Sequence, residues 1–498
     1  MGYLLGYDVG SSSVKVALVD SSSGKLVAHA TSPEKELEIS SPKPGWAEQQ
    51  PETWWEHLKR ATSMISKTPR VNLNDVQAIG ISYQMHGLVS VDRKLEPVRP
   101  AIIWCDSRAV EKGEEVFKKI GKKLCLERLL NSPGNFTLSK LLWVKENEPK
   151  NFKKIHKIML PGDWIAAKMT GEICTTPSGL SEMILWDFAQ DKRADFLLKK
   201  LGISEEIIPE VFNTFSIQGE ITKDASEELG LKKGIPVSYR AGDQPNNAFS
   251  LGVLEVDQAA TSAGTSGVIY WVTDKKVLDE KSRVNVFLHV NHTSEKPKYG
   301  VLLCINGCGI LYQWLKRNFG GSSSKVYEKM NKLAAGAPVG SLGLLFLPYG
   351  NGAERSLGNK YPRAMLSGLD FNIHTKSHIF RAATEGIAFS LNYGLEIMRR
   401  MGFKAKTIRS GIGNMFLSPV FREAFSNVTN TTLELYDTDG AQGAARGAGI
   451  GAGIFKDFGE AFRGLSKIME VEPDEKQSIY LEAYFDWKKA LEQALFSP

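Results

Sequence analysis

Two short turns rich in glycine and hydroxyl residues have the composition that binds a phosphate chain. The first is 10–13 (Gly-Ser-Ser-Ser), between two strand-like runs within Tyr3 to Asp20, and the second is 264–267 (Gly-Thr-Ser-Gly), before the strand-like run Val268 to Val272. Such turns let the backbone approach a phosphate and offer N–H and O–H donors. For either turn alone, a plain strand connection is the better interpretation. Because the pattern occurs twice, we predict two phosphate-binding turns.

Two aspartates stand at the ends of predicted strands, where they could take part in the same chemistry. Asp8 lies one residue before the end of the first strand, and a carboxylate there is unfavourable unless it binds donors or a cation, for which Mg²⁺ is the natural candidate. Asp243 follows a strand-like run, where α/β folds generally place ligands. Gly-Asp is also an ordinary turn pair, so position alone leaves Asp243 either catalytic or a turn residue.

Histidines and cysteines offer a weaker signal. His86, in 84–87 (Gln-Met-His-Gly), follows a strand that ends near Ser82, which is a ligand-binding position, although a lone histidine there is often structural. The pairs His374 with His378, His289 with His292, and Cys304 with Cys308 lack the further ligands or the spacing of a metal site. We therefore expect no metal bound by histidine or cysteine.

Common nucleotide-binding motifs are missing or out of context. No GxxxxGK[ST] loop occurs, so a P-loop enzyme is excluded. Asp457-Phe458-Gly459 resembles a protein-kinase tripeptide, but no HRD segment precedes it. The GxGxxA string within Gly447 to Gly453 lies too near the C-terminus for a dinucleotide-binding unit. It favours a helix packed closely on a strand or a nucleotide.

The elements that must position these residues alternate between strands and helices. Strand-like runs at 76–82 and 237–241 alternate with amphipathic stretches at 51–65 and 111–130, and the second half repeats this with strands at 301–305 and 407–410 and helices at 379–400 and 419–429. The fold class is therefore α/β. Since one hairpin opens each half, we predict two similar domains, 1–250 and 251–498, that share a ligand in the cleft between them. Glycine- and proline-rich segments at 40–45 and 348–362 are predicted surface loops at its border.

Composition excludes several classes of protein. The chain has 498 residues, 42% of them hydrophobic and 24% charged, which is typical of a folded globular protein. The net charge of +6 is spread among acidic residues with no basic, aromatic-rich stripe, so we expect no nucleic-acid partner. Apolar runs are only strand-sized, so no membrane insertion is expected. Five cysteines without a secretory leader indicate reduced thiols and a cytoplasmic location.

Several of these segments resemble the FGGY family of carbohydrate kinases, across essentially the whole chain. Residues 6–15 (Gly-Tyr-Asp-Val-Gly-Ser-Ser-Ser-Val-Lys) resemble its first phosphate motif, and 263–267 resemble its second. Residues 411–414 with Ser418 resemble its adenosine motif, except that Ile412 replaces a usual glycine, and 440–445 resemble its Gly-Ala stretch near the nucleotide. The resemblance implies two duplicated actin-like, ribonuclease-H-like domains around a central cleft.

The resemblance also implies roles for individual residues. Segments 84–87 and 104–108 (Trp-Cys-Asp-Ser-Arg) are more similar to xylulokinases than to glycerol kinases. The implied catalytic base is Asp243, and the implied metal site is Mg²⁺ at Asp8 and Asp243. The implied sugar contacts are Gln84, Met85, His86, Trp104, Asp106, Asp243 and Gln244. The implied ATP contacts are Ser11, Ser12, Ser13, Lys15, Gly264, Thr265, Ser266, Gly411, Gly413, Asn414 and Ser418.

The implied activity is ATP-dependent phosphorylation of the terminal hydroxyl of a ketopentose, D-xylulose to D-xylulose 5-phosphate. Xylulokinases usually follow the catalytic aspartate with Asn, whereas Gln244 follows it here, as is common in glycerol kinases. Ribulose, glycerol, gluconate or a longer ketose therefore stay open as acceptors. A nucleotide-driven switch of the same fold is the alternative from another class, but it would need no sugar pocket. Many family members are dimers, so the resemblance also implies a homodimer.

Overall fold

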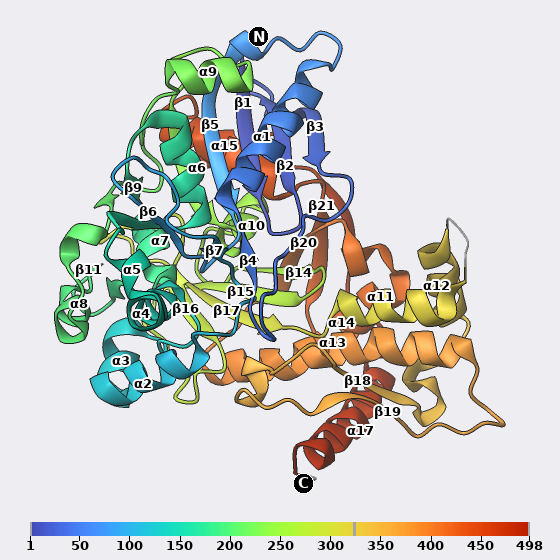
Figure 1. Ribbon diagram of the computed structural model, residues 1–498. Helices are drawn as coiled ribbons and strands as arrows, with labels where there is room; N and C mark the ends of the chain where they lie inside the picture. The colour runs from blue at the N-terminus through green and yellow to red at the C-terminus, as the bar shows by residue number, and fades with distance from the viewer. Residues whose placement is uncertain (1, 322–324, 497–498) are drawn as a thin grey trace.

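The protein is described by a computed structural model that covers residues 2–321 and 325–496 (Figure 1). A five-stranded sheet forms the first half, in the order β13-β5-β1-β2-β3. Its strands are β1 (Tyr3–Val9), β2 (Val14–Asp20), β3 (Leu26–Ser32), β5 (Val76–Tyr83) and β13 (Val237–Gly242). The hairpin strands β1, β2 and β3 pair antiparallel, and β1, β5 and β13 run parallel.

A seven-stranded sheet forms the second half, in the order β16-β17-β15-β14-β20-β21-β22. Its strands are β14 (Ala259–Ala263), β15 (Gly267–Thr273), β16 (Asn285–Leu288), β17 (Tyr299–Ile305), β20 (Thr407–Gly411), β21 (Thr432–Tyr436) and β22 (Lys467–Val471). Read as β21-β20-β14-β15-β17, its inner five strands match β13-β5-β1-β2-β3 of the first sheet, with the parallel and the antiparallel pairs at the same places. The predicted duplication of an α/β unit is therefore confirmed.

Helices flank both sheets, and short strand pairs connect them. The helices of the first half are α1 (Pro51–Ser66), α2 (Val110–Ile120), α3 (Lys122–Leu129), α4 (Thr137–Asn147), α5 (Pro149–Phe152), α6 (Pro161–Thr170), α7 (Pro177–Glu182), α8 (Asp195–Leu201), α9 (Lys223–Leu229) and α10 (Asp243–Ser250). Those of the second half are α11 (Gly309–Leu315), α12 (Val326–Ala335), α13 (Lys376–Arg400), α14 (Pro419–Thr429), α15 (Gly440–Gly451), α16 (Phe458–Ala461) and α17 (Gln477–Phe496). The two-stranded pairs are β4 (Glu48–Gln49) with β7 (Ala101–Ile102), β6 (Val89–Val91) with β8 (Lys157–Met159), β9 (Cys174–Thr175) with β12 (Glu210–Val211), β10 (Trp186–Asp187) with β11 (Lys192–Arg193), and β18 (Leu345–Tyr349) with β19 (Arg363–Ser367).

Helix α15 ties the halves together. It comes from the second half of the sequence, yet it packs on β1, β5 and β13 of the first sheet, where it lies beside the blue strands in Figure 1. Close approach requires glycine in the strands, because a β-carbon at Gly6 or Gly80 would overlap the carbonyl oxygen of Ala441 or Ala444. The prediction of a helix packed closely on a strand is confirmed, and the GxGxxA string lies in the last turns of α15 instead of in a turn between a strand and a helix.

Two sequence predictions differ from the fold. The stretch 111–130 is two helices, because the backbone of Gly121 between α2 and α3 takes a φ of 98° and breaks the helix. The segment 348–362 is only partly a surface loop, since it contains the buried end of β18 and the fully buried Glu354.

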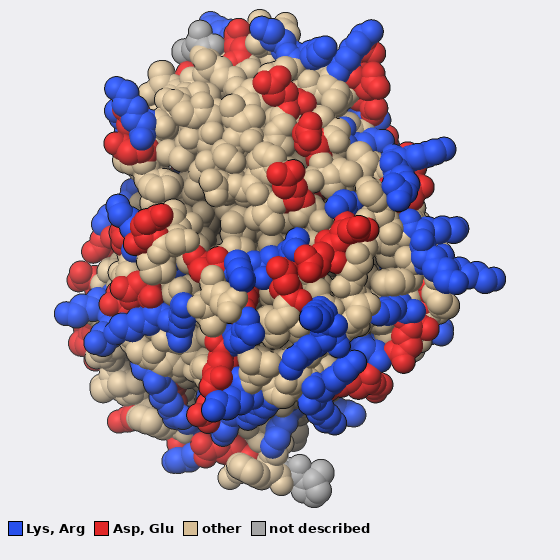
Figure 2. All heavy atoms as spheres, turned by 90° about the vertical axis from the view of Figure 1, so that its left-hand side faces the viewer, with Lys and Arg blue, Asp and Glu red and all other residues tan. Residues whose placement is uncertain are grey.

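The surface carries charges of both signs. Figure 2 shows lysine and arginine interspersed with aspartate and glutamate on one face, beside an area with few charges. None of the helices within 2–321 and 325–496 combines the length and the apolarity that crossing a bilayer requires.

Candidate active site

Strand register brings the two predicted aspartates together. Asp8 in β1 lies opposite Ser82 in β5, and Ser82 lies opposite Ala241 in β13. The carboxyl ends of these three parallel strands therefore meet at one edge of the sheet, which is where such folds bind ligands. Asp243 follows β13 directly and is the first residue of α10.

The two carboxylates perturb each other. Burial and the negative charge of Asp8 raise the pKa of Asp243 to about 7, while hydrogen bonds from Gln244 and the charge of Lys15 oppose the rise. Burial likewise raises the pKa of Asp8, and Asp439 adds to the rise, against Lys15 and a 2.9 Å hydrogen bond from Ser82 Oγ. A carboxylate that titrates near neutral pH is suited to accept a proton from a hydroxyl group.

Asp8 and Asp243 supply two carboxylates, which hold Mg²⁺ only together with water and substrate phosphates. Within the described parts of the chain, no group of three or more His, Cys, Asp or Glu side chains comes close enough to hold a metal ion. Magnesium, however, keeps several waters and is commonly held by one or two carboxylates together with substrate phosphates. Asp8 and Asp243, whose charges repel in a buried setting, match that donor set.

The predicted sugar segment lies beside Asp243. Met85 packs against Gly242, the residue before Asp243, so closely that a β-carbon at Gly242 would lie 2.6 Å from Met85 Cγ. The Gln84 side chain is buried, and its Oε1 has no hydrogen-bond partner among the described residues. The His86 ring contacts Phe136 and Phe287, with ring centroids 4.6 and 5.3 Å away. Since Phe287 belongs to β16, this segment touches both halves of the protein.

The second predicted sugar segment, 104–108, combines an exposed tryptophan with a buried aspartate. Trp104 is 40% exposed, and its indole N–H donates to Ser11 Oγ over 3.1 Å, which links this segment to the first phosphate turn. Asp106, in contrast, is fully buried and accepts hydrogen bonds from Arg108 and from the Ala47 N–H. These contacts favour a role for Asp106 in holding the Trp104 segment in place over direct contact with a sugar.

The two phosphate turns occupy equivalent places in the duplicated fold. Each connects the first and second strand of its sheet, 10–13 between β1 and β2 and 264–266 between β14 and β15. Lys15 lies opposite Asp8 in the first hairpin. In the second turn, the backbone carbonyls of Gly264 and Thr265 accept hydrogen bonds from the first residues of α11, at 2.9 and 3.2 Å. The topology therefore gives both predicted turns the same role in their sheets.

A pocket of about 330 Å³ adjoins the second turn. Predicted ATP contacts that line it are Gly264, Thr265, Asn414 and Ser418. Gly411 ends β20 just before this loop, and Gly413 has open space where a side chain would stand. The volume lies in the range of small-ligand pockets.

Sequence reasoning missed most of the lining of this pocket. The additional residues are Gly309, Ile310, Tyr312, Gln313, Tyr327, Asn331, Met415 and Leu417, whereas Ala263, which also lines the pocket, belongs to the segment that resembles the second phosphate motif. Tyr312 stacks on Tyr327 with ring centroids 6.0 Å apart, and its hydroxyl donates to Asn331 Oδ1 over 2.8 Å. Helices α11 and α12 supply these side chains, and no motif in the sequence marks them.

Sequence reasoning also missed charged residues around His86 and the second turn. Glu182 is buried, and its carboxylate accepts the Tyr83 hydroxyl and the His86 N–H. Glu354 is buried and accepts the N–H groups of Asn306 and Gly307. Arg355 lies over the Phe136 ring, with its Cζ 5.4 Å from the centroid. These residues come from a small-residue helix and a loop that carry no recognisable pattern.

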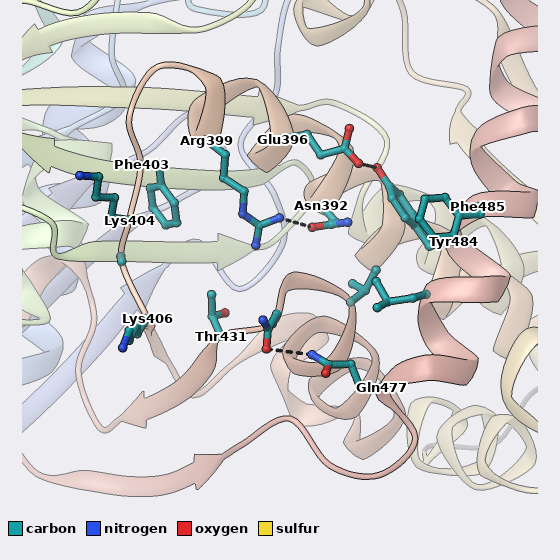
Figure 3. A pocket seen from close by; sticks show the side chains of 14 residues that line it. Asn392, Glu396, Arg399, Phe403, Lys404, Lys406, Thr431, Gln477, Tyr484 and Phe485 are labelled. Carbon is teal, nitrogen blue, oxygen red and sulfur yellow. Dashed lines mark hydrogen bonds between the residues drawn. The ribbon is translucent and has the colours of Figure 1, made fainter.

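A larger cavity, of about 620 Å³, lies elsewhere in the second half. Figure 3 shows its walls, which include Glu396 and Arg399 of α13, Thr431, and Tyr484 of α17. None of the predicted site residues lines it. Size alone therefore does not identify the active site, and the pairing of Asp8 with Asp243 beside the first turn makes the strand ends the candidate.

Both halves of the chain match domain models of one family of known proteins. The N-terminal domain model of the FGGY family of carbohydrate kinases matches residues 3–250, and the C-terminal domain model matches residues 259–454. The xylulose kinase of Bacillus subtilis (strain 168) is 31% identical over 462 residues, which are 92% of this chain and 90% of that protein. The xylulose kinase of Staphylococcus xylosus is 30% identical over 465 residues, covering 92% of this chain and 93% of that protein.

Solved structures share the fold over the full length. A kinase from Brucella ovis described as a xyloylose kinase superposes with a TM-score of 0.87 at 26% identity and covers 99% of both chains. The glycerol kinase of Plasmodium falciparum with ADP superposes with a TM-score of 0.88 at 23% identity, covering 100% of this chain and 99% of that one. With both family domains matched in order around an actin-like duplicated fold, the chain belongs to the FGGY family of carbohydrate kinases.

Proposed function

We propose that this carbohydrate kinase transfers the terminal phosphoryl group of ATP to the terminal hydroxyl of D-xylulose, producing D-xylulose 5-phosphate and ADP. Xylulose kinases of two species match 92% of the chain at 30% identity or more. The observation that carries the proposal is Asp243, a carboxylate with a pKa raised to about 7 beside the 84–86 segment.

Asp243 is the proposed catalytic base. It takes the proton of the terminal sugar hydroxyl as the oxygen of that hydroxyl attacks the γ-phosphorus, and the bond from that phosphorus to the bridging oxygen of ADP breaks. Such transfer depends on in-line placement and on neutralisation of charge, with little covalent work for the protein. Gln84, Met85, His86, Trp104 and Gln244 are the proposed sugar contacts, with Asp106 supporting them.

The proposed nucleotide contacts come from the two turns and from the residues beside the 330 Å³ pocket. The phosphates are held by Ser11, Ser12, Ser13, Lys15, Gly264, Thr265 and Ser266, and the adenosine by Gly411, Gly413, Asn414 and Ser418. Since the turns belong to different halves, the halves must close for both turns to engage the triphosphate. Closure also excludes water and so limits hydrolysis of ATP in the absence of sugar.

Asp8 and Asp243 are the proposed holders of Mg²⁺. The ion supplies positive charge that neutralises phosphate oxygens when it is bound. Asp8 would hold the ion with water completing its coordination shell, because magnesium gives up its hydration shell reluctantly.

The wider assignments are also proposals. We divide the chain into a sugar-binding and catalytic domain, 1–250, and a nucleotide-binding domain, 251–498, in keeping with the family-model matches. Five free cysteines support a reducing, cytoplasmic location. A homodimer is proposed from the family, and light scattering after size-exclusion chromatography tests it.

The test of the substrate is an ADP-release assay with D-xylulose, D-ribulose, glycerol and gluconate, compared by kcat/KM. We expect D-xylulose to give the highest value and ADP release without sugar to be slow. Gln244, which donates hydrogen bonds to Asp243, keeps glycerol as the second candidate. A higher kcat/KM for any other acceptor would overturn the assignment of D-xylulose.

A further inference from the structure

Glu182, the last residue of α7, occupies an unusual place between the two parts of the sugar site. Its side chain is 2% exposed. A β-carbon at Gly242, next to Asp243, would lie 3.1 and 3.2 Å from its two carboxylate oxygens. The proposed reaction assigns it no role, although it contacts the His86 turn and lies close to Gly242, the residue before Asp243.

The Glu182 carboxylate anchors the turn that carries His86. Oε1 accepts the Tyr83 hydroxyl over 2.7 Å, and Oε2 accepts the His86 backbone N–H over 3.2 Å. The backbone of His86 has a φ of 61°, a left-handed conformation that is uncommon for non-glycine residues and carries a free-energy cost. On the other side, Lys140 Nζ donates to the His86 carbonyl over 2.8 Å. Both backbone polar groups of His86, its N–H and its carbonyl, are thus held by buried side chains.

Glu182 also fixes the His86 ring through its backbone carbonyl, which lies 3.1 Å from Nδ1. A carbonyl oxygen only accepts hydrogen bonds, so Nδ1 must carry the hydrogen. Burial lowers the pKa of His86 to about 3, so the ring is neutral at physiological pH. Nε2 is then an acceptor, and it has no partner among the described residues.

We infer that Glu182 is a positioning residue of the sugar site, which holds His86 in its strained turn and in the Nδ1–H tautomer so that Nε2 accepts a hydrogen bond from a hydroxyl of the acceptor sugar. The inference rests on the proposed function only in that the acceptor is a polyhydroxy compound bound beside Asp243. It requires no particular sugar.

The chemistry of the carboxyl group predicts which replacements are tolerated. In Glu182→Gln, the amide oxygen still accepts the His86 N–H, and the amide NH₂ donates to the Tyr83 hydroxyl, which rotates to accept it. In Glu182→Ala, the His86 N–H loses its partner and the turn can relax. A buried donor left without a partner costs enough free energy to change an affinity about tenfold.

The experiment compares Glu182→Ala, Glu182→Gln and a matched control, Glu385→Ala. Glu385 is an equally buried glutamate that accepts hydrogen bonds from Arg381 and Gly340, far from the sugar segment in the second half. We expect Glu182→Ala to raise KM for the sugar by about tenfold or more, with KM for ATP changed less than about twofold. Glu182→Gln should keep KM for the sugar within about threefold of wild type, and Glu385→Ala should lower Tm without a selective effect on sugar binding. An unchanged sugar KM in Glu182→Ala, or an equal rise for ATP, would overturn the inference.

A second measurement needs no destabilised variant. Nitrogen-15 NMR of the histidines of the full-length wild-type protein, with the His86 signal assigned through its loss in His86→Asn, reports the tautomer directly. We expect a neutral ring protonated on Nδ1 at pH 7, in the wild type and in Glu182→Gln. A ring protonated on Nε2, or a cation, would overturn the inference even if Glu182→Ala fails to fold. If another acceptor replaces D-xylulose in the substrate panel, the proposed substrate fails while both measurements proceed with that acceptor.

Discussion

The negative charge of Asp8 raises the pKa of Asp243, and both side chains lie where parallel strands end at one edge of the first sheet. The effect of one carboxylate on the other gives Asp243 a pKa near neutral, which suits the role of base that we propose for it. The pH dependence of the enzyme and the effects of its variants follow from this pair and from the elements that place it.

Activity should depend on pH through Asp243. Its pKa is raised to about 7, so the carboxylate is protonated below that pH and cannot accept the hydroxyl proton. We expect kcat/KM for the sugar to rise with pH about tenfold per unit below 7 and to level off above it. Lys15→Met removes the cation that lowers the pKa of Asp243, so its profile should move to higher pH. A flat profile between pH 5 and 8, or a shift to lower pH in Lys15→Met, would contradict this.

Asp243→Ala should abolish sugar phosphorylation and spare nucleotide binding. A general base typically contributes about 10² to 10⁴ in rate, and Asp243 is proposed to contact the acceptor and not the adenosine. Steady-state ADP release measures turnover, and calorimetric titration measures ATP affinity. Wild-type turnover in this variant would refute the assignment of Asp243 as the base.

Asp243→Asn should stabilise the fold above neutral pH. The pKa of Asp243 is higher in the folded state than the usual aspartate value, so the folded state binds the proton more tightly than the unfolded state does, and stability from this group is lost as pH rises toward 7. Replacing the charge by an amide removes that loss. We expect Tm at pH 8 to rise by about 2 °C or more, with a smaller difference at pH 5. An equal Tm at pH 8 would show that burial of Asp243 carries no penalty.

KM for the sugar and KM for ATP should change in different variants. Met85→Ala and His86→Ala should raise KM for the sugar more than for ATP, because Met85 packs against Gly242, the residue before Asp243, and His86 follows it in the proposed sugar segment. Gln313→Ala, in the pocket beside the second turn, should do the reverse. Lys329→Ala, an exposed neighbour on α12, serves as the control with no effect on either constant. Equal effects on both ligands would refute the division of the site.

Gly80→Ala should destabilise the contact between α15 and the first sheet. The added methyl group would overlap the Ala444 carbonyl oxygen, and overpacking of this kind typically costs about 1 to 3 kcal/mol. Gly336→Ala is the control, since its β-carbon would meet its nearest neighbour, the Leu333 carbonyl oxygen, at 3.3 Å. Thermal unfolding of both variants measures the difference. An equal Tm for the two would contradict close packing at Gly80.

The sequence by itself determined the α/β class, the duplication and the position of two aspartates at strand ends. These signals are local, because a hairpin turn, an alternating run or an aspartate after a strand depends on residues close together in the chain. The two turns, with Asp8 and Asp243 beside the strand ends, could therefore be predicted from the order of the residues alone. The same local rules failed at Gly121, where a single left-handed residue divides one predicted helix into two.

Only the tertiary structure decided which distant residues meet. Three contacts join segments that are far apart in the sequence. The strand register sets Asp8 opposite Ser82, helix α15 packs on the sheet of the first half, and Glu182 contacts His86. Such contacts depend on how whole layers pack, and each is compatible with many local patterns. For that reason the two aspartates at the strand ends could be found from the sequence, whereas the residues that hold their neighbours in place could not.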